Sequence, residues 1–135
     1  VNLVVINDEE SQMLGKSDLI EECAKNILSC GPDYIIIKKG SQGAELFSKH
    51  QRSIIPALDN IKVVDPTGAG DSFVGGVCGY LASRPSISFK EIHNAMIYGS
   101  VIASFCIEEF GLARLQKISK EIIDERIKTF ASYLL

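Results

Sequence analysis

The sequence lacks an excess of basic residues. Its 135 residues include 14 Lys and Arg against 17 Asp and Glu, so the formal net charge is −3. Domains that bind nucleic acids usually carry a basic excess on one face, so this balance argues against a nucleic-acid partner. The hydrophobic fraction of 46% and the charged fraction of 23% are ordinary for a globular protein and argue against disorder. The length fits one domain at most, or part of one.

Metal-binding cysteine pairs are also absent. The four cysteines lie far apart without a CxxC pair, and the two histidines, His50 and His93, do not complete a zinc spacing. Each cysteine falls in an apolar or helical stretch, which favours buried thiols. Free thiols suit a reducing compartment, so we expect a cytoplasmic protein. The cysteines are Cys23, Cys30, Cys78 and Cys106.

No hydrophobic run is long enough to predict a membrane span. Residues 92–107 carry no formal charge when His93 is neutral, but a spanning helix needs about 20 apolar residues. A buried helix is the better interpretation, and no membrane partner is expected. The N-terminus shows no signal-peptide pattern, does not begin with Met and opens in an apolar run. We therefore expect a piece of a larger protein.

The spacing of hydrophobic and turn-forming residues predicts an α/β chain. Strands are expected over residues 1–6, 34–37, 44–47, 52–55 and 61–64. Helices are expected over residues 7–14 (with Gly15 as a stop), 17–29 and 69–82, from Ser88 with Glu91 in a capping box, and from Ser119 to near the end. A strand, a helix and a strand in that order imply a right-handed crossover and a parallel sheet.

The strongest chemical signal is the segment Asp65-Pro66-Thr67-Gly68-Ala69-Gly70-Asp71-Ser72-Phe73. It is neither a Walker A loop nor a dinucleotide-binding fingerprint. Its glycines permit a close approach to the main chain where a helix begins, and unpaired N–H groups there favour a phosphate or an oxyanion. Asp71 in the first turn could orient an acceptor hydroxyl and take its proton late. The alternative is an Asp that only stabilises the helix start, by about 0.3–1 kcal/mol.

Three more glycines fall inside the helix that follows: Gly75, Gly76 and Gly79. Each costs about 1 kcal/mol of helix propensity relative to Ala, so something must need the space. A closely packed neighbouring helix is the favoured interpretation, and a ligand is the alternative.

At these residues the chain resembles the PfkB/ribokinase family of sugar and nucleoside kinases. Residues 65–73 contain its GAGD core, Asn7-Asp8-Glu9-Glu10 matches its NxxE motif, and Gly40-Ser41-Gln42-Gly43 matches its GxxG turn. Glu109-Phe110-Gly111 is similar to the segment near the family's adenine pocket. The GAGD match is specific, whereas NxxE and GxxG alone are weak.

The resemblance implies a three-layer α/β/α ribokinase-like fold with a mainly parallel central sheet, here incomplete. It implies transfer of the ATP γ-phosphate to a primary hydroxyl of a sugar, a nucleoside or a related small alcohol. Asp71 would be the catalytic base, and the amides of Gly68, Ala69 and Gly70 would form the anion hole. Asn7 and Glu10 would help to hold Mg²⁺ and phosphate, largely through water. Asn-x-x-Glu is also a capping-box pattern, and the two interpretations are compatible.

Several further positions are assigned by the same resemblance. Asp65 and Thr67 match positions of a monovalent-cation site, so K⁺ is a candidate cofactor. Gly40 and Gly43 would form a turn beside the nucleotide. Lys38 replaces the small hydroxyl residue that often precedes this turn. It either reaches a phosphate or is a solvated strand-end lysine. Three residues of the helix over 92–107 would lie near the nucleotide, with core packing as the alternative: Gly99, Ser100 and Ala103.

We expect residues 1–135 to be the C-terminal nucleotide-binding and catalytic part of a kinase domain. The N-terminal half, which supplies most substrate contacts and a sheet lid that often mediates homodimers, would be absent. Two alternatives remain open. The chain is either a truncated homologue that binds ATP or another anion without turnover, or an α/β scaffold whose glycine loop is only structural.

Overall fold

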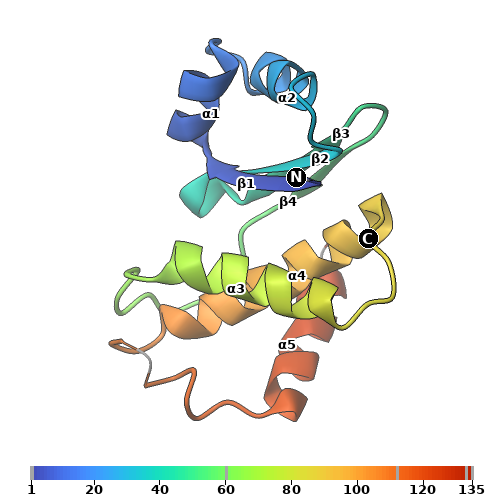
Figure 1. Ribbon diagram of the computed structural model, residues 1–135. Helices are drawn as coiled ribbons and strands as arrows, with labels where there is room; N and C mark the ends of the chain where they lie inside the picture. The colour runs from blue at the N-terminus through green and yellow to red at the C-terminus, as the bar shows by residue number, and fades with distance from the viewer. Residues whose placement is uncertain (1, 60, 112, 133, 135) are drawn as a thin grey trace. The chain divides into compact units, whose positions relative to one another are not determined.

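The computed structural model describes residues 2–59, 61–111, 113–132 and 134. The chain divides into two compact units, residues 1–57 and residues 58–135. The first unit contains a sheet with two helices, and the helices of the second unit are α3, α4 and α5 (Figure 1). Within the described ranges, no helix is long and apolar enough to cross a membrane.

The first unit is built on a four-stranded sheet in the order β1-β2-β3-β4. Its strands are β1 (Leu3–Asn7), β2 (Tyr34–Lys38), β3 (Ala44–Ser48) and β4 (Arg52–Ile55). β1 and β2 pair in parallel, as the order of strand and helix predicts, whereas β3 pairs antiparallel with both β2 and β4. The α/β class is confirmed, but this part of the sheet is less parallel than the resemblance implies.

Two helices connect β1 to β2 and lie on the same side of the sheet (Figure 1). They are α1 (Asp8–Gly15) and α2 (Ile20–Leu28). The predicted apolar stripe of α2 is confirmed, since Ala24 and Ile27 pack in a core with Ile35, Ile37 and Phe47 of the sheet. Helix α1 ends where Gly15 predicts. Gly15 is needed for packing, because a Cβ there would clash with the backbone of Cys23, and the left-handed residue that ends the helix is Lys16 (φ 53°).

The second unit contains α3 (Ala69–Ala82), α4 (Phe89–Cys106) and α5 (Lys120–Ser132). All three were expected, and the bounds of α3 agree with the prediction. Ser88 caps α4 through the Glu91 N–H, but the Glu91 carboxylate lies 3.9 Å from the Arg84 Nε and does not complete a capping box.

Two expectations are wrong. Residues 61–64 form no strand, and the backbone N–H of Val64 donates to the Ile107 carbonyl at 2.8 Å. The run is apolar and β-branched, but a strand also needs a neighbour to pair with, which local sequence cannot supply. Cys23 and Cys106 are buried as predicted, whereas Cys30 and Cys78 are exposed because they lie on the outer faces of their segments.

Candidate functional site

The loop before α3 is fastened to the carboxyl end of α4. The Ile107 carbonyl accepts hydrogen bonds from the backbone N–H groups of Val64 (2.8 Å) and Asp65 (3.1 Å). The Cys106 thiol donates to the Thr67 carbonyl at 3.6 Å. These contacts join segments about 40 residues apart, and they fix the loop on which the GAGD segment begins.

Asp65 and Thr67 form a small turn within this loop. The Thr67 N–H donates to Asp65 Oδ1 at 3.0 Å. Hydrogen bonds from the side chain and backbone of Thr67 hold the pKa of the Asp65 carboxyl below its ordinary value. Asp65 is therefore an ionised oxygen donor at neutral pH.

Gly68 is the N-cap of α3 and lies in the left-handed region, with φ 83°. Residues with a Cβ rarely adopt this conformation, which explains the glycine. The first bond of the helix runs from the Ser72 N–H to the Gly68 carbonyl at 2.9 Å. Within the described ranges, the N–H groups of Gly68 and Gly70 donate to no protein acceptor, whereas that of Ala69 donates to Pro66 at 3.2 Å. Two of the three amides predicted for the anion hole are thus available, and the third is already engaged.

Asp71 is exposed in the first turn of α3. No side-chain cap occupies the start of this helix, so Asp71 does not serve as its N-cap. Its carboxylate is placed one residue after Gly70, at the same helix start as the available N–H groups. The positive end of the helix dipole favours the ionised carboxylate there.

The glycines of α3 differ in role. A Cβ on Gly76 would lie 2.7 Å from the Gly99 Cα of α4, and one on Gly99 would lie 2.6 Å from the Phe73 carbonyl oxygen. Close helix packing therefore explains this pair. Gly75 and Gly79 have no neighbouring atom within 4 Å of such a Cβ, so packing does not explain them.

Three candidate nucleotide-side residues of α4 lie in its second half. Gly99 is buried against α3, while Ser100 and Ala103 are half-buried. The segment that resembles the adenine side follows the end of α4. There Phe110 is 73% exposed and Gly111 has φ 59°.

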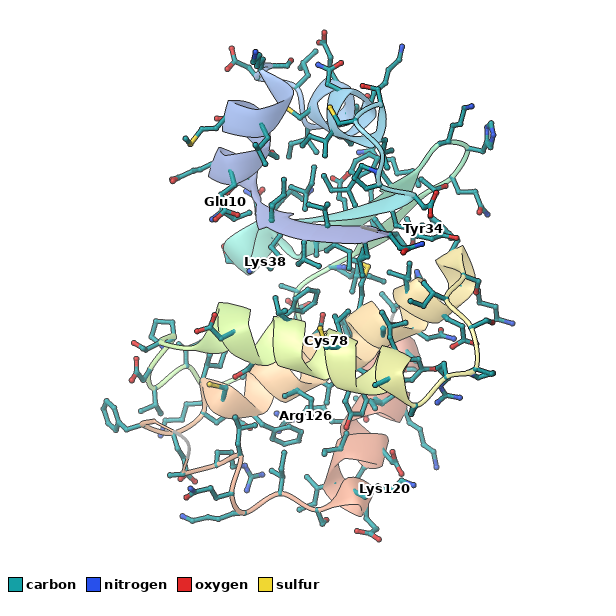
Figure 2. The ribbon with its side chains drawn as sticks, viewed as in Figure 1. Glu10, Tyr34, Lys38, Cys78, Lys120 and Arg126 are labelled. Carbon is teal, nitrogen blue, oxygen red and sulfur yellow. The ribbon has the colours of Figure 1, made fainter. Side chains whose placement is uncertain are left out.

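In the first unit, Asn7 and Lys38 end two neighbouring parallel strands and are partners in the register. Asn7 caps α1 in a full capping box: its Oδ1 accepts from the Glu10 N–H at 2.7 Å, and Glu10 Oε2 accepts from the Asn7 N–H at 2.9 Å. Figure 2 shows Glu10 and Lys38 at one end of the sheet and Tyr34 at the other. The carboxyl ends of parallel strands are where ligands bind in open α/β sheets.

The Gly40–Gly43 turn follows directly at the same end of β2. A short 3₁₀ turn, η1 (Gly40–Gln42), is closed by a 2.7 Å hydrogen bond from the Lys39 N–H to the Gly43 carbonyl. Gly43 has φ 90°, and a Cβ there would clash with the Ile55 carbonyl. Both its conformation and its surroundings therefore require glycine.

The predicted site residues thus form two groups, one in each unit, and each group is described by itself. The first comprises Asn7, Glu10, Lys38, Gly40 and Gly43, and the second comprises Asp65, Thr67, Gly68, Ala69, Gly70, Asp71, Gly99, Ser100 and Ala103. Across the described residues, no group of three or more His, Cys, Asp or Glu could hold a metal ion. Sequence reasoning missed the Ile107 carbonyl and the Glu45 carboxylate beside the GxxG turn. A charged residue in an otherwise apolar strand was the available signal for Glu45.

The comparisons with known proteins agree with these motifs. The family model described as "pfkB family carbohydrate kinase" matches residues 1–118. A nucleoside kinase of Methanocaldococcus jannaschii is 34% identical over 58% of this chain and 24% of its own length. Fructokinase-2 of Oryza sativa subsp. japonica is 29% identical over 82% of this chain and 33% of its own length. The chain therefore spans about a quarter to a third of these curated relatives.

The fold is shared with solved kinases. A fructokinase from Vibrio cholerae O395, crystallised with fructose, ADP and calcium ion, has a TM-score of 0.79 and 23% identity. The match covers 93% of this chain and 40% of the fructokinase. At this identity the likeness establishes the ribokinase-like fold.

Proposed function

Because the chain belongs to the pfkB family of carbohydrate kinases, we propose that it forms the nucleotide-side, catalytic part of an enzyme that transfers the γ-phosphate of ATP to a hydroxyl of a sugar or nucleoside. The observation that carries the proposal is the start of α3, where left-handed Gly68, the available Gly70 N–H and Asp71 adjoin. An anion seat beside a carboxylate suits phosphoryl transfer. The nucleoside kinase and fructokinase relatives support this class of acceptor.

Each residue of this helix start has a distinct role in the proposal. Asp71 orients the acceptor hydroxyl and takes its proton late in the transfer. The N–H groups of Gly68 and Gly70 stabilise the negative charge that develops on the transferred phosphoryl group. Ala69 joins them only when its 3.2 Å bond to Pro66 opens.

The chain offers oxygen donors that suit Mg²⁺, which prefers oxygen ligands and keeps several waters. Glu10 is exposed and uses Oε2 in the capping box, so Asn7 and Glu10 would hold Mg²⁺ largely through water. When bound, Mg²⁺ supplies neutralisation of phosphate charge. Asp65 and Thr67 would contribute to a site for K⁺.

The remaining candidate residues would line the nucleotide. Lys38 and the turn from Gly40 to Gly43 would contact phosphate, since Lys38 has no hydrogen-bond or ion-pair partner among the described residues. On α4, Ser100 and Ala103 would lie towards the nucleotide. Gly99 would act mainly through its packing on α3.

The proposal is tested by calorimetry of Mg-ATP binding to the full-length natural protein. Gly70→Val should weaken binding at least tenfold, because its side chain blocks close approach to the main chain. Asp71→Asn should bind Mg-ATP like the natural protein but lose about 10²–10⁴-fold in transfer, the contribution typical of a general base. Transfer is measured as ADP release with a panel of sugars and nucleosides.

The outcomes separate the alternatives. If both variants bind Mg-ATP like the natural protein, the anion-hole assignment is wrong. If the natural protein binds Mg-ATP but releases no ADP with any acceptor, a binding module without turnover is favoured. An absence of binding by the folded protein supports a purely structural glycine loop.

A further inference from the structure

Glu45 carries a buried carboxylate that the proposed mechanism does not use. It lies in β3 two residues after Gly43 and is 4% exposed. Burying a carboxylate is unfavourable unless it is paired and hydrogen-bonded. Both oxygens are paired here: Lys39 Nζ lies 2.5 Å from Oε1, and Arg52 donates to Oε2 from Nε at 3.0 Å and Nη2 at 2.8 Å.

This ion-pair network holds the Gly40–Gly43 turn at its base. Lys39 is the last residue before the turn, and its backbone N–H closes the turn on the Gly43 carbonyl at 2.7 Å. The same residue therefore fixes the turn through its backbone and ties it to β3 through its side chain. Gly43 is also fixed, since its Cα faces the Ile55 carbonyl of β4 with no space for a Cβ.

The other end of the network is anchored away from the turn. Arg52 of β4 pairs with Glu21 of α2 at 2.5 Å, and its guanidinium lies 5.2 Å from the Phe47 ring centroid. The formal charges of Lys39, Arg52, Glu45 and Glu21 sum to zero. The Lys39 charge is thus neutralised within the protein, whereas no described residue pairs with Lys38.

We infer that Glu45, acting through Lys39, is a positioning residue that sets the Gly40–Gly43 turn for phosphate binding and leaves Lys38 as the lysine that meets the ligand. This inference rests on the proposed function, because it deepens the role of the same turn. Two adjacent lysines then have different tasks: Lys39 ties the turn to the sheet, and Lys38 contributes charge to the phosphates. Loss of the network should impair recognition of the phosphates and spare recognition of the nucleoside.

The test compares the dissociation constants of Mg-ATP and of adenosine, by calorimetry, in the full-length natural protein and its variants. Glu45→Gln and Lys39→Met should each weaken Mg-ATP about tenfold, within the coupling range of contacting charged residues. Adenosine, which has no phosphate, should bind within about twofold of the natural protein. The double variant should bind Mg-ATP about as weakly as either single one, since both remove the same contact.

Two further variants serve as matched controls. Glu21→Gln breaks only the exposed pair with Arg52 and should leave Mg-ATP binding within about twofold. Lys38→Met should weaken Mg-ATP and should combine additively with Glu45→Gln, because the two act separately in the proposal. Circular dichroism establishes that each variant is folded.

The inference fails if folded Glu45→Gln and Lys39→Met bind Mg-ATP like the natural protein. It also fails if both variants lose affinity for adenosine and Mg-ATP by the same factor, because the network would then support the fold alone. Failure of the natural protein itself to bind Mg-ATP would overturn the proposed function and this inference with it.

Discussion

Arg126 connects α5 to the end of α4 that supports the glycine loop. Its guanidinium donates to both oxygens of Glu108 at 2.8 and 3.2 Å and to Ser104 Oγ at 3.0 Å. It also lies 3.6 Å from the centroid of the buried Phe105 ring. Figure 2 shows Arg126 where α5 meets α4. One side chain therefore combines a bidentate ion pair, a hydrogen bond and a cation–π contact.

Replacing Arg126 by Met should lower the free energy of unfolding by about 2–3 kcal/mol, because Glu108 and Ser104 lose their charged donor. Lys117→Met is the matched control. It removes an exposed pair with Glu109 at 3.5 Å, and such pairs contribute at most about 1 kcal/mol. Urea unfolding followed by far-UV circular dichroism measures both. Equal losses in the two variants would show that the Arg126 contacts contribute little.

The packing of α3 against α4 depends on a crossing at Gly76 and Gly99. The backbones approach closely there, so neither position has space for a Cβ. Gly79, one turn after Gly76 in the same helix, faces open space. Two glycines in one helix thus have opposite relations to stability: the first is required by a neighbour, and the second only weakens the helix.

Gly76→Ala should therefore destabilise the protein by about 1–3 kcal/mol, because the added methyl group meets the α4 backbone, which cannot move aside locally. Gly79→Ala should stabilise it by about 0.5–1 kcal/mol through helix propensity. Thermal unfolding of the two variants decides between these directions. A stabilising Gly76→Ala would mean that α3 and α4 cross less closely than the structure shows.

At the scale of the whole molecule, the sequence predicts the elements better than their partners. The stripe of α2 and the bounds of α3 follow from local periodicity. The strand expected over 61–64 fails because pairing depends on a distant neighbour, and Val64 instead meets the Ile107 carbonyl. The same limit applies to the site. The motif predicts the left-handed Gly68, while the Glu45 pairs depend on how β3 and β4 lie beside the turn.

The acid response of the molecule follows from two groups whose pKa values are lowered in the folded state. Burial lowers the pKa of His93 in α4. Burial alone would raise the pKa of Glu45, but hydrogen bonds from Lys39 and Arg52 outweigh it and lower the pKa. In both cases the unfolded chain binds the proton first as pH falls, so folding stability must decrease. The loss begins near the ordinary histidine pKa of about 6.5 and resumes below the ordinary glutamate pKa of about 4.3.

We therefore expect the melting temperature of the full-length natural protein to fall between pH 7.5 and 5.5 and to fall further between pH 5.0 and 3.5. His93→Gln should reduce the first fall, because its side chain does not titrate, and Glu45→Gln should reduce the second. Glu21→Gln is the control for the second step, since Glu21 is exposed and shares only the outer end of the network. If the Glu45 and Glu21 variants respond alike below pH 5, the buried ion pairs do not govern acid stability. The response would then reflect the exposed carboxylates as a group.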